Sequence, residues 1–379
     1  MLEIREIHTR AELQKFVDFP FELYKDNDYW VGPIRKEEVD TLDWSLNPVF
    51  QNALGRYFLA YQDGKIVGRI AALINWIEVK DLKKSKVRFG WFDTIDDLKV
   101  SRALLEKVAE VGREHQLSFI EGPVGFSNLD KAGMLVDGFE ELNTMITLYN
   151  YPYYAKHMEE LGFQKLAQWV EYEIQITDFE QSPEKVKKFS QIIMDRYQLK
   201  LLDFKSTQEL LPYVDQMFVL LGQTYDRLQT FVPVQPYQIK YYKERYFRYI
   251  HPEFIKCIAD KDDRLIAFAI TMPSFSRALK KMNGKLFPFG FLHLLWARYR
   301  IRKASFYLIG VHPDFQNKGV TAIIFNEIQK LLNKYNISIV ETNPELEENE
   351  AIQKLWRNYT NRQHKKRATY TRAVDSLSE

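Results

Sequence analysis

Apolar and polar stretches alternate along the chain in a way that predicts the same elements twice. Residues 56–76 carry apolar runs on both sides of Asp63-Gly64, a dipeptide typical of β-hairpin turns. Phe254 to Met272 repeats this arrangement around a polar turn at Asp260–Arg264. Each half of the chain therefore begins its predicted sheet with a hairpin.

Each hairpin is followed by a predicted strand, helix and strand, and then by a second helix and a closing strand. In the first half these segments are 87–92, 97–115, 117–121, 151–161 and 167–174, and in the second half they are 305–311, 321–335, 337–341, 350–359 and 367–373. Equivalent elements lie about 200 residues apart. This order predicts an internally duplicated α/β (α+β) protein in which helices flank a central sheet in each copy.

The length of 379 residues is sufficient for two domains. Gln181-Ser182-Pro183 interrupts the pattern, so we expect one lobe at 1–180 and another at 181–379. A composition of 46% apolar and 27% charged residues indicates a globular chain. The net charge of only +2 argues against nucleic-acid binding by bulk electrostatics.

The single cysteine, Cys257, excludes an intramolecular disulfide, and its apolar neighbours predict a buried thiol. We expect no metal site. The N-terminus is charged from the start and lacks the apolar core of a signal peptide. The longest apolar run, 287–297, has about half the length of a bilayer span. These features predict a soluble, cytoplasmic protein.

A polar loop with a glycine leads into the predicted helix at 321–335. Its sequence after the strand ending at Val311 is Gln316-Asn317-Lys318-Gly319-Val320-Thr321. The first N–H groups of a helix lack intrahelical acceptors, and the helix dipole adds positive potential there. Gly319 lets the backbone approach an anion, and Lys318 adds a charge. The loop therefore suits a pyrophosphate, with an ordinary β–α turn as the alternative.

This segment resembles the signature V-x-P-x-x-Q/R-x-x-G-x-G/A of the GCN5-related N-acetyltransferase (GNAT) superfamily, which wraps the pyrophosphate of acetyl-CoA. Val311, Pro313, Gln316 and Gly319 match the signature, whereas Thr321 stands where the family has Gly or Ala. The resemblance implies two GNAT-like lobes, each with a mixed, mostly antiparallel sheet.

The resemblance continues downstream. Residues 337–343 are similar to the next strand of the family, and 349–356 to its N-x-x-A-I-x-x-L-Y helix. By resemblance, the pantetheine of acetyl-CoA or another acyl-CoA lies between the strands that end at Val311 and Glu341. The implied cofactor contacts are Ile309, Gly310, Val311, Gln316, Asn317, Lys318, Gly319, Val320, Thr321 and Asn349.

The first half resembles the same fold more weakly. Residues 153–163 are similar to the late helix of the family and the Gly-Phe that follows it. The loop signature is missing, and Asp93, Asp96 and Asp97 would repel a pyrophosphate. We expect this lobe to have lost cofactor binding.

Aminolysis of a thioester needs a base for the ammonium proton, a donor for the oxyanion and an acid for the thiolate. The resemblance implies the backbone N–H of Val311 as the oxyanion donor. Glu341 is the first candidate base and His312 the second, with a plain hydrogen-bonding role for Glu341 as the alternative. Trp356 replaces the usual acidic tyrosine, so Tyr359 is the candidate acid unless it is simply a packed tyrosine.

The acceptor side is less defined. The predicted helix at 217–227 should form one wall, with Tyr225 and Asp226 as candidate acceptor-binding residues. The insertion 276–303 mixes basic and aromatic residues, which fits a lid for an acidic or long acyl group, a membrane- or partner-binding hairpin, or a solvated basic loop. The run 364–367 is expected to be a solvated turn.

The leading hypothesis is an N-acyltransferase that moves an acyl group from acyl-CoA to a small-molecule or peptide primary amine by direct attack. One alternative is an aminoacyl-, peptidyl- or fatty-acyl-type transferase on a two-lobed fold. Another is a non-catalytic CoA sensor or interaction protein, suggested by Trp356 and by the degenerate first lobe. The acceptor, the acyl length and the oligomeric state stay open.

Overall fold

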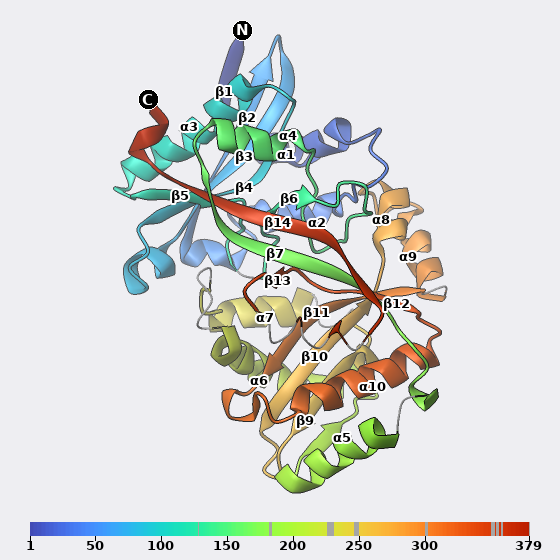
Figure 1. The fold of residues 1–379 in the computed structure, drawn as a ribbon. Helices are drawn as coiled ribbons and strands as arrows, with labels where there is room; N and C mark the ends of the chain where they lie inside the picture. The colour runs from blue at the N-terminus through green and yellow to red at the C-terminus, as the bar shows by residue number, and fades with distance from the viewer. Residues whose placement is uncertain are drawn as a thin grey trace.

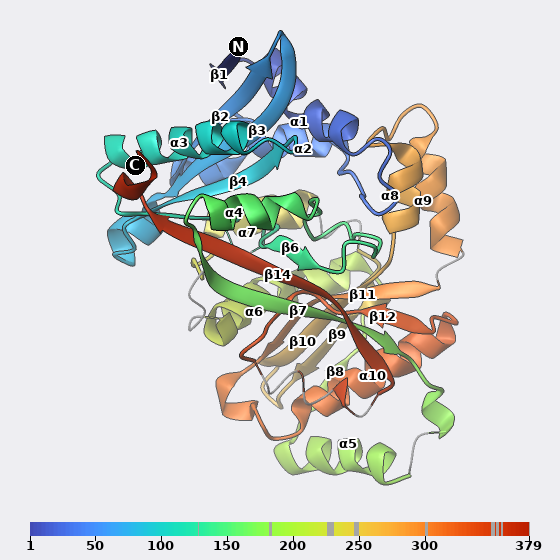
Figure 2. The same ribbon diagram turned by 45° about the horizontal axis from the view of Figure 1, so that its top comes forward.

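One continuous mixed sheet runs through both lobes of the computed structural model (Figures 1 and 2). The structure describes residues 1–379 except 128, 182–183, 226–230, 246–249, 300–301, 350–352, 354–355, 358 and 379. Most strand pairs are antiparallel, and helices flank the sheet, as the sequence predicts.

The first half of the chain contains β1 (Leu2–Ile7), α1 (Arg10–Leu23), α2 (Arg35–Leu42), β2 (Ala53–Gln62), β3 (Lys65–Asn75), β4 (Lys86–Thr94), α3 (Leu98–Glu114), β5 (Phe119–Gly122), β6 (Met134–Asp137), α4 (Tyr153–Glu160) and β7 (Gln164–Gln175). The second half contains α5 (Glu184–Tyr197), β8 (Lys200–Leu202), α6 (Thr207–Tyr225), α7 (Pro236–Arg245), β9 (Ile255–Ala259), β10 (Leu265–Pro273), α8 (Ser276–Met282), α9 (Gly290–Tyr299), β11 (Lys303–Val311), α10 (Val320–Lys334), β12 (Ile339–Glu341), β13 (Glu345–Leu346) and β14 (Asn361–Ala373).

The predicted duplication is present in the strand pairing. Strands β1 to β5 pair in sequence order, and β8 to β12 do the same. In each set only the last pair, β4–β5 or β11–β12, is parallel. The first hairpin turns at Asp63 and Gly64, whose φ angles of 50° and 78° fit the tight turn that the sequence predicts.

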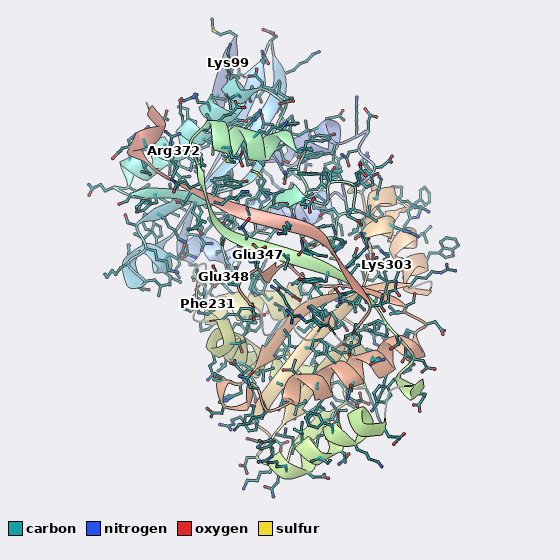
Figure 3. The ribbon with its side chains drawn as sticks, in the orientation of Figure 1. Lys99, Phe231, Lys303, Glu347, Glu348 and Arg372 are labelled. Atoms are coloured by element: carbon teal, nitrogen blue, oxygen red, sulfur yellow. The ribbon has the colours of Figure 1, made fainter. Side chains whose placement is uncertain are left out.

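The closing strands of the two halves are exchanged. The sheet order around its centre is β5-β14-β7-β12, so β14 completes the first lobe and β7 completes the second. Figure 1 accordingly shows both chain termini on the first lobe, and Figure 3 labels Arg372 there, near the end of β14. Residue 180 thus marks the sequence repeat, whereas the sheet is not divided at that point.

The expectation of a solvated turn at 364–367 is wrong. These residues lie inside β14, and His364, Lys365 and Arg367 are all buried. The run can be buried because Glu171 of β7 is also buried and faces it. Its carboxylate bonds to Arg367 and lies 3.8 Å from the Lys365 ammonium, which balances the charge inside the sheet.

Separate apolar cores cover the faces of the sheet. In the first lobe α3 and α4 pack on one face and α1 on the other. In the second lobe α10 and α5 take one face and α6 the other. Cys257 is buried, as expected. Among the described residues, no helix combines the length and apolar character needed to cross a bilayer.

Replacing Arg367 with Met should destabilise the whole molecule by about 3–5 kcal/mol, because Glu171 is then left buried without a bonded cation. Denaturant unfolding measures this loss, and the matched control is Arg5→Met, which breaks an exposed pair with Glu3 and should change little. A double change of Glu171 and Arg367 to Met should recover only part of the loss, because the buried Lys365 then loses its neighbouring carboxylate. Equal effects of Arg367→Met and Arg5→Met would contradict the role of this pair.

Candidate active site

Strands β11 and β12 run side by side over only three residues and then diverge. Their pairing ends where Ser305 meets Glu341. Thr342 continues along β7, since its N–H donates to the Tyr172 carbonyl at 2.9 Å. β11 instead follows β10 as far as Val311. Within the part of the chain that the structure describes, the divergence leaves one edge of β11 without a neighbouring strand from residue 306 onward.

Side chains bond to the carbonyl groups along this open edge. Asn343 donates to Tyr307, Tyr225 donates to Ile309 at 3.1 Å, and Gln316 donates to Val311 at 3.2 Å. Such single bonds satisfy the backbone without fixing a strand, so a ligand that carries amide groups can replace them. The predicted cofactor residues Ile309, Gly310 and Val311 therefore lie on a backbone edge that is covered by side chains.

The loop 316–319 brings this edge to the start of α10. Asn317 and Gly319 both have positive φ angles, 59° and 82°. The first intrahelical bonds run from Ala322 and Ile323 to the Gly319 carbonyl, so the N–H groups of Val320 and Thr321 lie before them.

Gly319 is required for packing as well as for its backbone angle. A Cβ at this position would lie 2.3 Å from the Ile193 side chain of α5. Lys318 is exposed, and its ammonium lies 5.4 Å from the ring centre of Tyr197 and 5.3 Å from that of Phe315. The loop thus presents a cation beside a helix N-terminus, which is a favourable place for an anion.

The equivalent helix start in the first lobe is already occupied by an acidic side chain. Asp97 caps α3 by accepting a hydrogen bond from the Lys99 N–H at 2.9 Å. A carboxylate in this position satisfies the helix dipole and repels a second anion.

In the first lobe, β4 and the segment after β5 stay together, whereas β11 and β12 of the second lobe diverge. After β5, the Val124 N–H donates to the Phe89 carbonyl of β4 at 2.9 Å, which keeps the two segments together. The buried Arg88 side chain fills the adjoining space and donates to Glu78 at 2.8 Å. The open edge and the uncapped helix start are therefore combined in the second lobe.

Glu341, the candidate base, ends β12 in a row of polar residues that crosses four strands. In register with it are Ser305, Glu173 and Arg362. Glu173 accepts from Lys303 at 2.7 Å and from Arg362 at 3.1 Å. Burial opposes its ionisation, yet these hydrogen bonds lower the pKa of Glu173 to about 2. Glu173 is therefore a fixed ion-pair partner.

Glu341 itself is less strongly compensated. It is 6% exposed, and the Lys303 ammonium lies 4.0 Å away. Burial raises the pKa of Glu341 above its ordinary value, against the attraction of Lys365 and Lys303. A buried carboxylate with a raised pKa is a better proton acceptor than Glu173.

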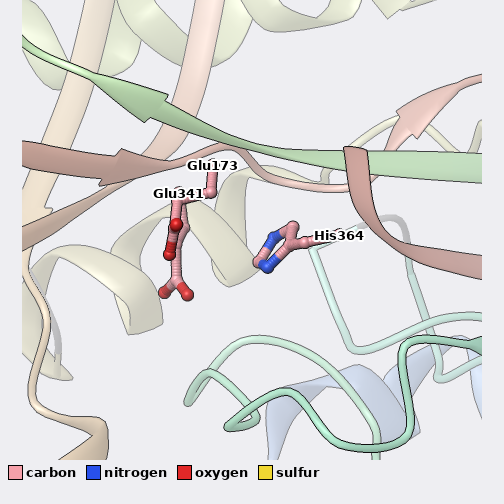
Figure 4. A group of neighbouring side chains, drawn as sticks. All are labelled: Glu173, Glu341 and His364. Atoms are coloured by element: carbon pink, nitrogen blue, oxygen red, sulfur yellow. The ribbon is translucent and has the colours of Figure 1, made fainter. Parts of the chain in front are cut away.

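His364 lies beside both glutamates, on the same side of the sheet (Figure 4). Burial and the charge of Lys365 lower the pKa of His364 to about 4, so its ring is neutral at pH 7. A carboxylate oxygen of Glu173, a carboxylate oxygen of Glu341 and a ring nitrogen of His364 lie within 4.8 Å of one another. Since Lys303 and Arg362 already neutralise Glu173, this arrangement suits proton handling better than a metal ion.

A small, mainly apolar cavity adjoins the open edge of β11. It is lined by Met145, Ile146, Met272, Pro273, Ser274, Phe275, Ser276, Ser305 and Tyr307. Its walls come from both lobes and from the beginning of the insertion 276–303. The cavity has a volume of about 10 Å³, which is room for a single water molecule.

No family model matches the sequence. Among solved structures, the chain is similar to a tandem GNAT protein from the clavulanic acid biosynthesis pathway, with a TM-score of 0.58, 10% identity and 99% of both chains covered. The chain has a tandem GNAT fold. A GNAT protein from Sphaerobacter thermophilus has a TM-score of 0.53 and 10% identity, over 98% of this chain and 96% of that one.

Two relatives are similar in sequence. Protein YghO of Escherichia coli is 27% identical over 324 residues, which cover 85% of this chain and 81% of the relative. Bacterial ceramide synthase of Caulobacter vibrioides is 24% identical over 390 residues, which cover 98% of each chain.

The candidate site also contains the carboxyl group of Glu345, which the sequence did not reveal. Trp356, in place of the usual acidic tyrosine, donates its indole N–H to the Glu345 carboxylate at 2.9 Å and 3.1 Å. Burial raises the pKa of Glu345 to about 8. Glu345 also lies near the open edge, since its charge adds to burial in raising the pKa of Tyr225 to about 12. In the sequence it reads as part of a polar loop, and the only hint is a tryptophan in the acid position.

The remaining predicted residues are placed as follows. Tyr359 is partly buried 6.5 Å from Trp356, measured between ring centres, and burial raises its pKa. Asn349 is exposed, and its N–H donates locally to Leu346 at 2.9 Å. His312 accepts through Nδ1 from the Asp314 N–H at 3.3 Å. Asp226 lies outside the described residues.

Replacing Glu345 with Gln should stabilise the fold at high pH. A raised pKa means that the protonated side chain is favoured in the folded state, so wild-type stability falls as pH rises from 4.5 through about 8. We expect Glu345→Gln to gain on the order of 1–3 kcal/mol over wild type at pH 9 and almost nothing at pH 5. Urea unfolding at both pH values measures this difference, with the exposed Glu348→Gln as the control. A difference that does not change with pH would contradict the raised pKa.

Proposed function

We propose that the protein is an acyl-CoA-dependent N-acyltransferase that joins a long acyl chain to the primary amine of a long-chain base. The observation that carries this proposal is the open edge of β11 beside the uncapped start of α10, within a GNAT fold. The full-length similarity to a bacterial ceramide synthase supports the choice of acceptor, because a ceramide is an amide of a fatty acid and a long-chain amino alcohol.

The second lobe offers groups for each part of the donor. The N–H groups of residues 317–321 and the Lys318 ammonium would hold the pyrophosphate, by the helix-dipole effect and by direct charge. The pantetheine amides would replace the Tyr225 and Asn343 bonds to the β11 carbonyls. The Val311 N–H would then stabilise the oxyanion.

The space beside Ser305 has apolar walls but a volume of only about 10 Å³, so it would have to widen to admit an acyl or alkyl chain. Met145, Ile146, Met272 and Phe275 all contribute to its walls. Burying each methylene of a chain against such walls contributes about 0.8 kcal/mol, a gain that an acetyl group cannot make. The similarity to the bacterial ceramide synthase makes a fatty acyl-CoA the leading donor, with acetyl-CoA as the alternative.

Glu341 and Glu345 have different pKa values and therefore fit different steps. Glu341 would take one proton from the ammonium group, after which the amine nitrogen attacks the thioester carbon, the C–S bond breaks and the nitrogen gives up its second proton to solvent, which leaves the neutral amide. Glu345, protonated at neutral pH because its pKa is about 8, would give its proton to the departing thiolate. An ordinary thiol has a pKa of about 8.5, so donor and acceptor are closely matched. This supplies the acid that Trp356 cannot provide.

Reversing the charge of Lys318 should weaken CoA binding about tenfold, equivalent to about 1.4 kcal/mol. Titration calorimetry with CoA measures this for Lys318→Glu. The matched control is Lys99→Glu, an exposed lysine in the first turn of the equivalent helix of the first lobe (Figure 3). We expect no change in the control. A larger effect of Lys99→Glu would contradict the proposal, because it would mean that CoA binds to the first lobe.

Activity itself can be measured with palmitoyl-CoA and sphinganine, by following released thiol and detecting the amide by mass spectrometry. Glu341→Gln should reduce kcat at least a hundredfold, as expected for loss of a general base. In Glu345→Gln the rate should be lower, and the decline of kcat above pH 8 should disappear. Glu347→Gln, an exposed neighbour, is the control.

The outcomes of this assay are distinguishable. Turnover with acetyl-CoA but not palmitoyl-CoA would contradict the long-chain donor while leaving the acyltransferase reaction in place. CoA binding without thiol release for any amine tested would contradict catalysis and favour a CoA sensor.

A further inference from the structure

The insertion 276–303 forms a helical hairpin whose far end is apolar and exposed. We call residues 287–296 the apolar tip. Five of its large side chains are between 48% and 73% exposed, namely Phe287, Phe289, Leu292, Leu295 and Trp296. Exposed apolar side chains are common singly, but such a concentration in ten residues marks an interaction surface.

Helix α9 is apolar on opposite faces. Leu295 and Trp296 lie three and four residues after Leu292, which places all three on the exposed face of the helix. Leu294, on the other face, packs against Leu279 and Met282 of α8. A helix that packs one face on the protein normally turns a polar face outward. We therefore expect the second apolar face of α9 to contact another apolar surface.

The base of the hairpin is firmly attached to the first lobe. Leu279 and Met282 are buried against Val31. The Gly284 carbonyl accepts from the Arg35 N–H at 3.0 Å, and Lys280 donates to the Asn27 carbonyl at 3.2 Å. Figures 1 and 2 show α8 and α9 at the edge of the molecule. The fixed base holds the tip outward, so its exposure does not come from loose packing.

The hairpin is also the basic part of a nearly neutral chain. Residues 276–303 contain eight Lys and Arg and no Asp or Glu. Because the whole chain carries +2, all other residues together carry −6. Lys280 lies 3.4 Å from Asp28, but Lys281 and Lys285 are exposed next to the tip. Apolar side chains bordered by cations are typical of surfaces that bind anionic lipid.

We propose that the apolar tip docks onto the surface of an anionic phospholipid bilayer. Phe289, Leu292 and Trp296 would enter the boundary between headgroups and acyl chains, while Lys281 and Lys285 contact the phosphates. A second copy of this chain is a poor occupant, because it would bring two sets of eight cationic residues together. The tip is too short to cross the bilayer.

The base of the hairpin lies next to the candidate active site. Phe275 and Ser276, at its base, line the cavity that also contains Ser305 and Tyr307 of β11. Docking at the tip would therefore bring the candidate active site close to the bilayer surface, where a long-chain substrate is found. This role rests on the proposed function, whereas the docking itself does not.

Co-sedimentation with vesicles tests the docking without CoA or substrate. Wild type should bind vesicles of mixed phosphatidylglycerol and phosphatidylcholine, and bind phosphatidylcholine vesicles far less. The double variant F289S/W296S should bind the mixed vesicles at least about tenfold more weakly. K281E/K285E should lose the preference for phosphatidylglycerol. The control L46S/V219S removes exposed apolar side chains elsewhere and should behave as wild type.

Folding and cofactor binding of each variant are checked by thermal unfolding and CoA calorimetry, which should match wild type. The proposal is overturned if wild type does not bind vesicles, or if F289S/W296S binds as tightly. It is also overturned if wild type forms a dimer that F289S/W296S abolishes while vesicle binding is absent, since the tip would then serve self-association. Failure of CoA binding in wild type would instead contradict the proposed function and leave the vesicle result valid.

Discussion

The pairing of β7 with β14 is the constraint on which the rest of the molecule depends. The two strands run antiparallel from the pair Ile174–Asn361 to the pair Gln164–Thr371, and each also completes the sheet of the opposite lobe. The buried bond between Glu171 and Arg367 lies within this ladder. Because of the exchange, Glu341 of β12 has Glu173 of β7 as its neighbour and Arg362 of β14 beyond it. Residues far apart in the chain thus set the charge around the candidate base.

The duplicated lobes differ in how equivalent lysine and glutamate residues are paired. Lys86 and Lys303 begin β4 and β11, and Glu121 and Glu341 occupy the same position in the paired strands. In the first lobe the Lys86 ammonium lies 2.6 Å from Glu121, which fixes that carboxylate. In the second lobe Lys303 bonds to Glu173 instead and stays 4.0 Å from Glu341. The carboxylate beside the open edge is thus the one that its lysine holds less closely.

The sequence allowed the local elements to be predicted, because hairpin turns, helix periodicity and the Gly319 loop depend on neighbouring residues. The exchange of β7 and β14 could not be predicted, since both closing strands read alike and nothing local chooses their partner. The run 364–367 looked solvated because its partner, Glu171, lies on a distant strand. Glu345 was missed for the same reason, as its raised pKa comes from burial against β7 and Trp356. Features that depend on pairing between distant segments could therefore not be predicted from the sequence.

The central claim is that a nucleotide thioester binds along β11 with its phosphates at the start of α10. A crystal structure of the protein with bound CoA tests this most directly. We predict pyrophosphate oxygens within hydrogen-bonding distance of the N–H groups at 317–321, and pantetheine in contact with the β11 edge where Tyr225 and Asn343 now bond. Density for CoA at the Asp97 end of α3, or away from both helix starts, would contradict it.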